Sequence, residues 1–532
     1  MRRRCTAFMG ILLVALTASG QQQLRTERGK FEVSGKLINA LTGELIHNAF
    51  VQLSPATQSG APARSEVSAD GSFAFHDLAP GKYSLMAQAR NFPQQSLDQH
   101  EGFSTAVAVG ADKTSTGIVF RLRPQSSISG RVLDEHNEPV REAQVILFEK
   151  NNDLGRRRVE MHGQLQTDDQ GEYHFAHLGP GTYYVAVSAQ PWYRRYYVQQ
   201  FARKRGDDQP ADSALDIAYP LTFYPNATES DGAGAILLRP GDRITADFDL
   251  TPVPSLHLTL PNSGPPGSLR APTFQNLVFG EPAQFLQPNL SGRDGELDIS
   301  GIAPGDYLLQ AGDGRDPPAR MHVSLRQSGA LEIPSLEGIQ SIHGTVKFEG
   351  ERWPNAFLHI VDLDSGRQMG VRIDEQQEFT INPERPGRLA FALVNAPGYA
   401  IRTIAATGGR VSGRTVEFTA KEPLELSILV SAGVGKVNGT VVRADQPLAG
   451  AMVVLIPQNI ADNITLFRRD QSDSDGTFTL PDVVPGRYTV IALENGWEME
   501  WTSPDRLRPY LALGTSVEIT GKEQLDIKVA AQ

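Results

Sequence analysis

Residues 70–85, DGSFAFHDLAPGKYSL, place two acids and a histidine between two glycines. A carboxylate beside an imidazole is a common arrangement for general acid–base chemistry, because histidine titrates near neutral pH. The same residue types at short spacing can also bind a metal ion. Either function would require the side chains of His76 and Asp77 wherever this stretch recurs.

The stretch recurs along the chain, but its histidine and its second acid do not. Its copies occupy residues 70–85, 170–185, 294–309, 376–391 (a degenerate copy) and 475–490. In the second copy Ala176 and His177 stand where His76 and Asp77 stand in the first. The shared features are a turn residue, alternating apolar positions and a Pro-Gly pair, with a tyrosine two residues after the glycine in four copies. These features are typical of a β-hairpin, so we interpret the stretch as architecture.

Sequence signatures of hydrolytic enzymes are missing elsewhere in the chain. Neither a G-x-S-x-G nucleophile motif nor an H-E-x-x-H zinc motif occurs. His174 and His177 are the closest pair of histidines, but positions three apart on a strand should point to opposite faces. We expect these histidines to be exposed residues and expect no metal site or cofactor.

Residues 471–482, QSDSDGTFTLPD, weakly resemble a calcium-binding loop. Asp473, Asp475 and Asp482 fall at spacings that such loops use, but Gln471 stands at the first ligand position. The turn of the hairpin already explains Asp475-Gly476, so calcium binding is not predicted here.

The best candidate for a binding site is an insertion at residues 191–217. Aromatic and basic side chains alternate there, although the chain as a whole is acidic. We predict that the site residues are Trp192, Tyr193, Arg194, Arg195, Tyr196 and Tyr197. Such a patch suits an acidic polysaccharide or a protein partner. The alternative is a helix that covers the edge of a sandwich and prevents edge-to-edge pairing.

Aromatic residues also recur nine positions after the repeat tyrosine, at Phe92, Trp192 and Trp497. Aromatic rings at loop tips stack on sugars or grip peptides. Alternatively they cap the open end of each sandwich, and the fixed spacing favours this structural interpretation.

The elements that position these residues are short strands separated by turns, without convincing helices between them. We predict an all-β chain of five β-sandwich modules. Modules one to five cover residues 28–124, 125–254 (with the insertion), 255–335 (a degenerate copy), 336–431 and 432–532.

The N-terminus and the composition indicate export. Arg2, Arg3 and Arg4 precede an apolar run and the small residues of 18–20, which predicts a secretory signal peptide over residues 1–20. No later apolar run reaches about 18 residues, so the mature chain should not insert into a membrane. Loss of the three arginines leaves 47 basic and 61 acidic residues, a net charge of −14. Such a charge disfavours nucleic acid as a partner. Cys5 lies within the leader, which excludes cysteine chemistry from the mature chain.

The combination of strand, glycine, second strand, D-G-x-[FY]-x-[FIL] and P-G-x-Y resembles the carboxypeptidase regulatory-like domain. The resemblance implies a transthyretin-like, Ig-like Greek-key sandwich that is not catalytic and works outside the cytoplasm. Residues 218–250 and 495–519 resemble segments of secreted tandem arrays of such domains from acidobacteria.

These observations favour a secreted or periplasmic, non-enzymatic binding or scaffold protein of the bacterial cell envelope, with a carbohydrate or an envelope or extracellular protein as its partner. Two alternatives stay open. One is a polysaccharide or peptide hydrolase with its site in the insertion, and the other is a spacer without a ligand.

Overall fold

The structure is a computed structural model. It describes residues 30–56, 61–152, 155–193, 215–261, 272–285, 288–293, 296–311, 319–331, 341–350, 353, 355–383, 385–419 and 422–532. The predicted signal peptide and residues 194–214 of the insertion lie outside the described residues.

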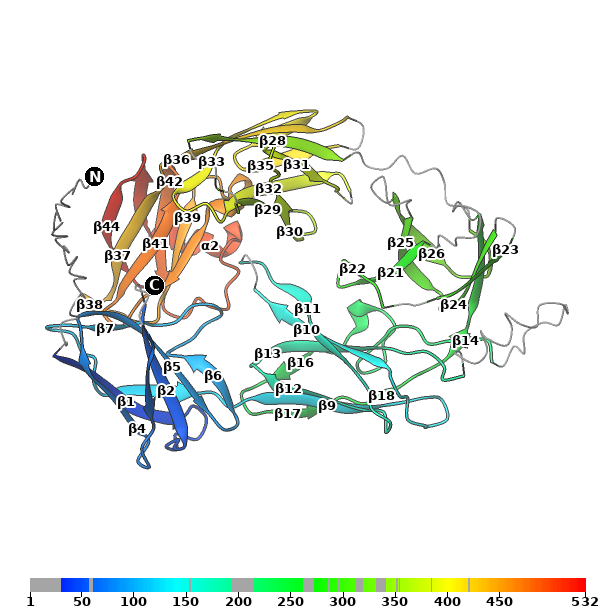
Figure 1. Ribbon diagram of the computed structural model, residues 1–532, viewed down its shortest axis with the longest axis horizontal. Coiled ribbons are helices and arrows are strands. Elements are labelled where there is room, and N and C mark those ends of the chain that lie inside the picture. Colours follow the sequence, from blue (N-terminus) through cyan, green and yellow to red (C-terminus); the bar gives the residue numbers. More distant parts are fainter. Residues whose placement is uncertain are drawn as a thin grey trace, which may run out of the picture.

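The described strands form five successive sandwiches (Figure 1). Module one contains β1 (Phe31–Asn39), β2 (Ala49–Pro55), β3 (Ala63–Glu66), β4 (Ser72–Leu78), β5 (Gly81–Ala89), β6 (Phe92–Ser96), β7 (Val107–Val109) and β8 (Ile118–Leu122). Module two contains β9 (Ser126–Leu133), β10 (Gln144–Asn151), β11 (Arg158–Gln166), β12 (Glu172–Leu178), β13 (Gly181–Ser188), β14 (Ile217–Ala218), β15 (Thr222–Phe223), the 3₁₀ turn η2 (Ser230–Gly232), β16 (Ile236–Leu238), β17 (Arg243–Thr245), β18 (Phe248–Asp249) and β19 (Val253–Pro254).

Modules three and four follow the same plan. Module three contains β20 (Leu256–Pro261), β21 (Thr273–Val278), β22 (Glu281–Ala283), β23 (Asn289–Arg293), β24 (Glu296–Ile302), β25 (Gly305–Ala311), β26 (Ala319–Leu325) and β27 (Gly329–Ala330). Module four contains β28 (Ile342–Glu349), β29 (Phe357–Asp362), β30 (Gln368–Arg372), β31 (Glu378–Ile381), β32 (Gly387–Val394), β33 (Tyr399–Thr407), β34 (Gly409–Ser412), β35 (Thr415–Phe418) and β36 (Glu425–Ala432).

Module five also carries short helical elements. It contains β37 (Gly435–Arg443), β38 (Gln446–Pro447), β39 (Met452–Pro457), η3 (Ile460–Asp462), η4 (Ile464–Leu466), β40 (Arg468–Gln471), β41 (Thr477–Val483), β42 (Gly486–Leu493), α2 (Pro504–Leu511), β43 (Thr515–Ile519) and β44 (Gln524–Ala530). Helix α2 was not predicted. It begins after Ser503 with Pro504 in its first turn and buries Leu507 beneath it, against an outer apolar cluster of module five.

All five modules share one topology. The opening strand (β1, β9, β20, β28 or β37) pairs antiparallel with the first strand of the repeat hairpin and parallel with the closing strand. The second strand of the hairpin lies in the other sheet, beside β2, β10, β21, β29 or β39. The prediction of an all-β tandem array of sandwiches is confirmed. The residue limits assigned to the modules stay predictions.

Each sandwich encloses its own apolar core. In module one Phe73 and Phe75 are buried, while Ser72 and Ala74, which alternate with them, are partly exposed, as the alternation predicts. A glycine of the opening strand recurs because the parallel closing strand comes close. A Cβ at Gly35 would lie 2.1 Å from the carbonyl oxygen of Ile118, and one at Gly130 would lie 2.0 Å from that of Ala246.

The repeat tyrosine fixes the hairpin turn in modules one, two, three and five. Each hydroxyl donates a hydrogen bond to the carbonyl oxygen four residues earlier, just before the Pro-Gly pair; the tyrosines are Tyr83, Tyr183, Tyr307 and Tyr488. Burial raises the pKa of the Tyr307 and Tyr488 hydroxyls to about 12. Leu389 replaces the tyrosine in module four.

The position of Asp77 in the repeat is a β-bulge. Asp77, His177, Gly301 and Asp482 all have positive φ, between 50° and 78°, on the first strand of their hairpins. What the copies share at this position is therefore a backbone conformation that glycine, aspartate and histidine adopt more readily than most residues. This explains why the side chain changes from copy to copy.

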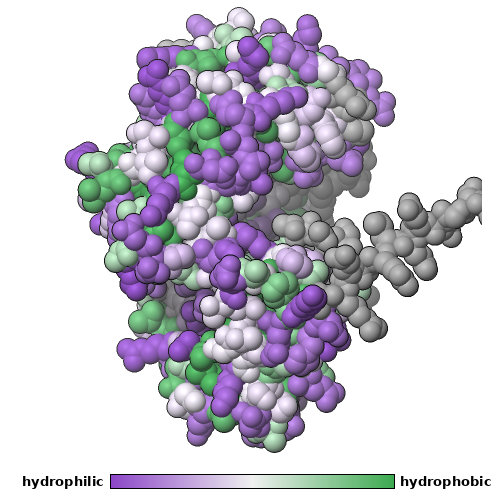
Figure 2. All heavy atoms as spheres, turned by 90° about the vertical axis from the view of Figure 1, so that its left-hand side faces the viewer, coloured by the Kyte–Doolittle hydropathy of each residue, from purple (hydrophilic) through white to green (hydrophobic). Residues whose placement is uncertain are grey.

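The array curves so that module one, in blue, lies beside module five, in orange and red (Figure 1). The face that carries these two modules is mostly hydrophilic, with hydrophobic residues in small groups (Figure 2). No helix of the described residues is long and apolar enough to cross a membrane.

Candidate functional site

The structure describes only the start of the predicted aromatic–arginine patch. Trp192 is 72% exposed, and its ring meets that of Tyr193 edge-on, with 5.7 Å between the ring centroids. Arg194, Arg195, Tyr196 and Tyr197 lie outside the described residues. The patch therefore stays a prediction, and its described part is the exposed Trp192 and the partly buried Tyr193.

The aromatic residues that share a spacing after the repeat tyrosine do not share an environment. Phe92 is half-buried against the core of module one, whereas Trp192 is exposed. Trp497 is buried and stacks on His100 of module one, with ring centroids 4.8 Å apart. The common spacing therefore does not define a common function.

The two nearby histidines of module two are exposed, as expected. The bulge between Phe175 and Leu178 breaks the alternation, so His174 and His177 are both exposed. His177 Nδ1 forms a hydrogen bond with Gln125 Oε1. Among the described residues, Asp134, Glu135 and His136 form a group whose possible metal ligands lie close together. They belong to a turn in which the Asp134 carboxylate accepts hydrogen bonds from the backbone N–H groups of His136 and Glu138.

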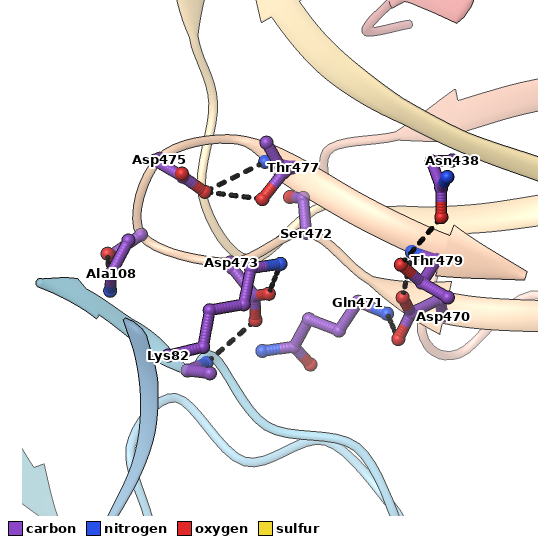
Figure 3. A network of polar contacts seen from close by, with 12 residues as sticks. Lys82, Ala108, Asn438, Asp470, Gln471, Ser472, Asp473, Asp475, Thr477 and Thr479 are labelled. Carbon is purple, nitrogen blue, oxygen red and sulfur yellow. Dashed lines mark hydrogen bonds and ion pairs between the residues drawn. The ribbon is translucent and has the colours of Figure 1, made fainter. Parts of the chain in front are cut away.

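Two acids of the calcium-like stretch, Asp473 and Asp475, form ion pairs with lysines of module one, and Figure 3 shows the pair of Asp473 with Lys82. Asp473 forms an ion pair with Lys82 and accepts a hydrogen bond from Ala106 N at 2.9 Å. Asp475 forms an ion pair with Lys113, with 2.8 Å between Oδ2 and Nζ. These partners neutralise both carboxylates, so the stretch works as a contact between modules one and five.

Arg469 lies at the centre of this contact. Its guanidinium forms an ion pair with Glu101 of module one. Its Cζ lies 5.0 Å from the ring centroid of Phe103, 5.7 Å from that of Trp497 and 4.4 Å from that of Trp501. The neighbouring Gln471 is buried and donates to Asp98 O and Thr105 Oγ1, both at 2.8 Å. We call this contact, centred on Arg469, the 1–5 junction.

The pKa values of two carboxyl groups of the 1–5 junction are shifted in opposite directions. It raises the pKa of Asp473, and the ion pair with Lys82 only partly opposes this effect. Burial alone would also raise the pKa of Asp475, but hydrogen bonds from Lys113 and Thr477 outweigh it and lower that pKa.

A pocket of about 360 Å³ lies where module five meets module four, which we call the 4–5 junction. Its walls come from β32, the turn before β33, β33 itself and the segment between β34 and β35 on one side, and from η4, β40 and β41 on the other. Two arginines, one acid and one tyrosine line it; they are Arg414, Arg468, Asp482 and Tyr399.

Among the described residues neither pocket arginine forms a salt bridge, although the charge of Asp482 partly opposes the fall in the pKa of Arg468. Arg414 is 8% exposed, and no acceptor for its guanidinium is found among the described residues. Arg468 donates only to carbonyl oxygens, those of Thr465 (3.2 Å), Phe467 (2.8 Å) and Asp482 (3.0 Å). The Asp482 carboxylate instead accepts a hydrogen bond from Gly398 N at 3.3 Å.

Burial lowers the pKa of both pocket guanidinium groups. They stay protonated near neutral pH because the ordinary value for arginine is so high. The repeat tyrosine Tyr488 lies close enough that the two charges partly oppose the rise of its own pKa. Asp482 is the acid of this pocket and acts electrostatically on Arg468, so the charge that no described acid compensates is that of Arg414.

Sequence patterns did not predict either junction. Glu101 and Arg469 are separated by 368 residues, and Arg414 lies in a short turn without a motif. The available signal was the basic pair Arg468-Arg469, which breaks an otherwise ordinary strand pattern just before the repeat hairpin.

The comparison with family models decides the type of two modules. Residues 32–123 and 127–216 each match the carboxypeptidase regulatory-like domain. Modules one and two are carboxypeptidase regulatory-like domains. This confirms the resemblance for these modules and shows a tandem arrangement, whereas the resemblance to acidobacterial arrays stays a prediction.

Similarity to individual proteins is weaker than the match to the carboxypeptidase regulatory-like domain. Colossin-A of Dictyostelium discoideum is 24% identical over 271 residues, which is 46% of this chain but only 2% of that protein. The chain thus spans a small fraction of this relative.

Three solved structures match the chain at low identity and low TM-score. The Bacillus anthracis TIE protein is 11% identical, with 91% of this chain and 68% of that chain covered and a TM-score of 0.15. A streptococcal ancillary pilin is 13% identical (56% and 98% covered, TM-score 0.17). The minor pilin of Streptococcus agalactiae is 12% identical (42% and 96% covered, TM-score 0.20). At such TM-scores the fold assignment rests on the strand pairing and the cores described above.

Proposed function

We propose that the chain is a secreted, non-enzymatic scaffold and binding protein of the bacterial cell envelope, whose modules recognise carbohydrate or protein partners. The observation that carries this proposal is the 1–5 junction. Lys82, Lys113 and Glu101 of module one meet Asp473, Asp475 and Arg469 of module five, so the array is held in a defined arrangement. A fixed array presents several surfaces at set distances, which favours multivalent binding.

The role of the repeated residues supports a scaffold over an enzyme. The tyrosine of P-G-x-Y holds a turn, and the residue at the position of Asp77 forms a bulge. Both therefore serve the framework in each copy rather than a reaction.

The test is a binding screen of the chain without residues 1–20 against polysaccharides and cell-envelope fractions. We expect binding to at least one of them, and a loss of this binding in Trp192→Ala, because Trp192 is a large exposed aromatic ring. Leu237→Ala is the matched control, since Leu237 is 63% exposed in the same module.

Two outcomes would contradict the proposal. Release of new chain ends from a polysaccharide or a peptide by the purified protein would favour the hydrolase. A folded protein that binds none of the fractions would favour the spacer.

A further inference from the structure

The 4–5 junction buries the charge of Arg414 without a described acid to compensate it. Arg414 is 8% exposed and lines the pocket, and the described residues offer its guanidinium no carboxylate and no hydrogen-bond acceptor. A buried charge is costly unless it is paired and hydrogen-bonded. Arg468 of module five adds a second guanidinium, held in place by three carbonyl oxygens.

The donors that stay unused define the ligand chemistry. Arg414 has its whole guanidinium available, and Arg468 keeps the N–H of Nε and one N–H of Nη2. A guanidinium matches a carboxylate in shape and can donate two parallel hydrogen bonds to it. A carboxylate between the two arginines would therefore supply the missing partner.

The remaining walls favour a sugar as the carrier of that carboxylate. Tyr399 lines the pocket and is supported edge-on by Trp353, with ring centroids 6.3 Å apart. Small side chains, those of Ala392, Ala396 and Ala400, line the same side. Aromatic rings and small apolar groups suit the flat face of a sugar ring. The carboxylate of Asp482 is placed to accept hydrogen bonds from sugar hydroxyl groups.

We propose that the pocket at the 4–5 junction binds a uronic acid residue of an acidic polysaccharide, with its carboxylate held between Arg414 and Arg468. Its volume of about 360 Å³ lies at the small end of the range for small-molecule sites. This inference rests on the proposed binding function and assigns it a ligand class and a site that does not involve the insertion.

The test is calorimetric titration of the chain without residues 1–20 with glucuronate, with glucose as the uncharged control ligand. We expect glucuronate to bind and glucose to bind much more weakly. Arg414→Met should reduce the affinity for glucuronate at least about tenfold, as the loss of hydrogen bonds between charged groups does. The matched control is Arg402→Met, since Arg402 is exposed on β33 of the same module and does not line the pocket.

A thermal unfolding experiment separates binding from folding. Glucuronate should raise the unfolding midpoint of the wild type but not that of Arg414→Met. Without ligand, the variant should have an unchanged or higher midpoint, because methionine removes an unpaired buried charge. Tyr399→Leu keeps an apolar side chain but removes the flat ring, so it should weaken binding without unfolding the protein.

Three results would overturn the inference. Glucuronate binding that survives both Arg414→Met and Tyr399→Leu would place the site elsewhere and leave the binding function standing. Capture of an uncharged polysaccharide or an envelope protein, without glucuronate binding, would refute the uronate site alone. Binding of a short peptide through its C-terminal carboxylate, in preference to glucuronate, would replace the sugar with a peptide.

Discussion

Module five uses two adjacent arginines of β40 in different ways. Arg469 turns to module one, where its charge meets Glu101 and the ring of Phe103, while Trp497 and Trp501 of module five lie on its guanidinium. Arg468 turns to the pocket shared with module four, where carbonyl oxygens are its hydrogen-bond acceptors. The two junctions thus differ in whether the protein itself supplies the counter-charge.

This difference distinguishes a structural contact from a site. At the 1–5 junction Arg469, Asp473 and Asp475 each have an oppositely charged partner on module one. At the 4–5 junction Arg414 has no oppositely charged partner among the described residues. The pocket that Arg414 and Arg468 line also leaves an open volume beside them. Charge balance at a buried interface is therefore a useful criterion for finding sites in arrays of small modules.

The largest expected effect is that of Arg469→Met, which removes the ion pair with Glu101 and the contacts with the rings. We expect the 1–5 junction to weaken by about 2 kcal/mol. Modules one and five should then separate in a larger fraction of the molecules, and small-angle X-ray scattering would record this as a larger radius of gyration. Arg487→Met is the control, because Arg487 pairs with Glu518 at an exposed site. An unchanged radius in Arg469→Met would show that the junction does not depend on this pair.

Arg468→Met should have a smaller effect that is confined to module five. It leaves the carbonyl oxygens of Thr465, Phe467 and Asp482 without their donor, at an expected loss of about 1–2 kcal/mol. The urea midpoint of unfolding should fall while the radius of gyration stays the same. A larger radius of gyration in Arg468→Met would mean that the two junctions are coupled, and it would contradict their separate roles.

Tyr488→Phe tests whether the repeat tyrosine does more at the 4–5 junction than elsewhere. Its hydroxyl donates to Val484 O at 2.7 Å, and Tyr307 makes the same bond in module three. We expect a loss of about 1 kcal/mol for either Tyr→Phe variant, measured by urea unfolding. A much greater loss for Tyr488→Phe would assign that hydroxyl a role in holding the pocket arginines.

The smallest effect is a dependence of stability on pH at the 1–5 junction. Because the folded pKa of Asp473 lies above its ordinary value of 3.8, its contribution to stability should increase as the pH falls through the folded pKa, and level off below 3.8. Asp475 has a lowered pKa and should lose its contribution as the pH falls below 3.8.

Urea midpoints measured from about pH 3 to about pH 6 would separate the two contributions. Asp473→Asn should remove the first effect and Asp475→Asn the second. If both substitutions changed the profile in the same direction, the electrostatic account of the 1–5 junction would be wrong.

Local features of the sequence were enough to predict the sandwiches. The alternation around Phe73 and Phe75 and the Pro-Gly turn follow from contacts within a few residues, and the opening glycine follows from contact with the closing strand of the same module. The bulge could also have been recognised, because Gly301 occupies the position of Asp77 in the third copy. A glycine that exchanges with aspartate points to a left-handed backbone conformation.

The junctions could not be predicted in this way. Arg469 meets Glu101 only because five sandwiches turn the chain back on itself, and that turn depends on the angles between modules. Trp497 illustrates the point, since it has the same spacing as Phe92 and Trp192 but is buried by His100 of another module. The spacing within a repeat predicts where a residue lies in its own sandwich, but it does not predict which residues of other modules contact it.

The contact between the first and the last module also determines how the protein would carry load. A force that pulls β1 of module one away from β44 of module five acts first on the 1–5 junction (Figure 1). Modules two, three and four lie in the loop that this junction closes, so they are shielded from tension until it separates. The junction would then act as a mechanical fuse, and its rupture would release a long tether while every sandwich is still folded.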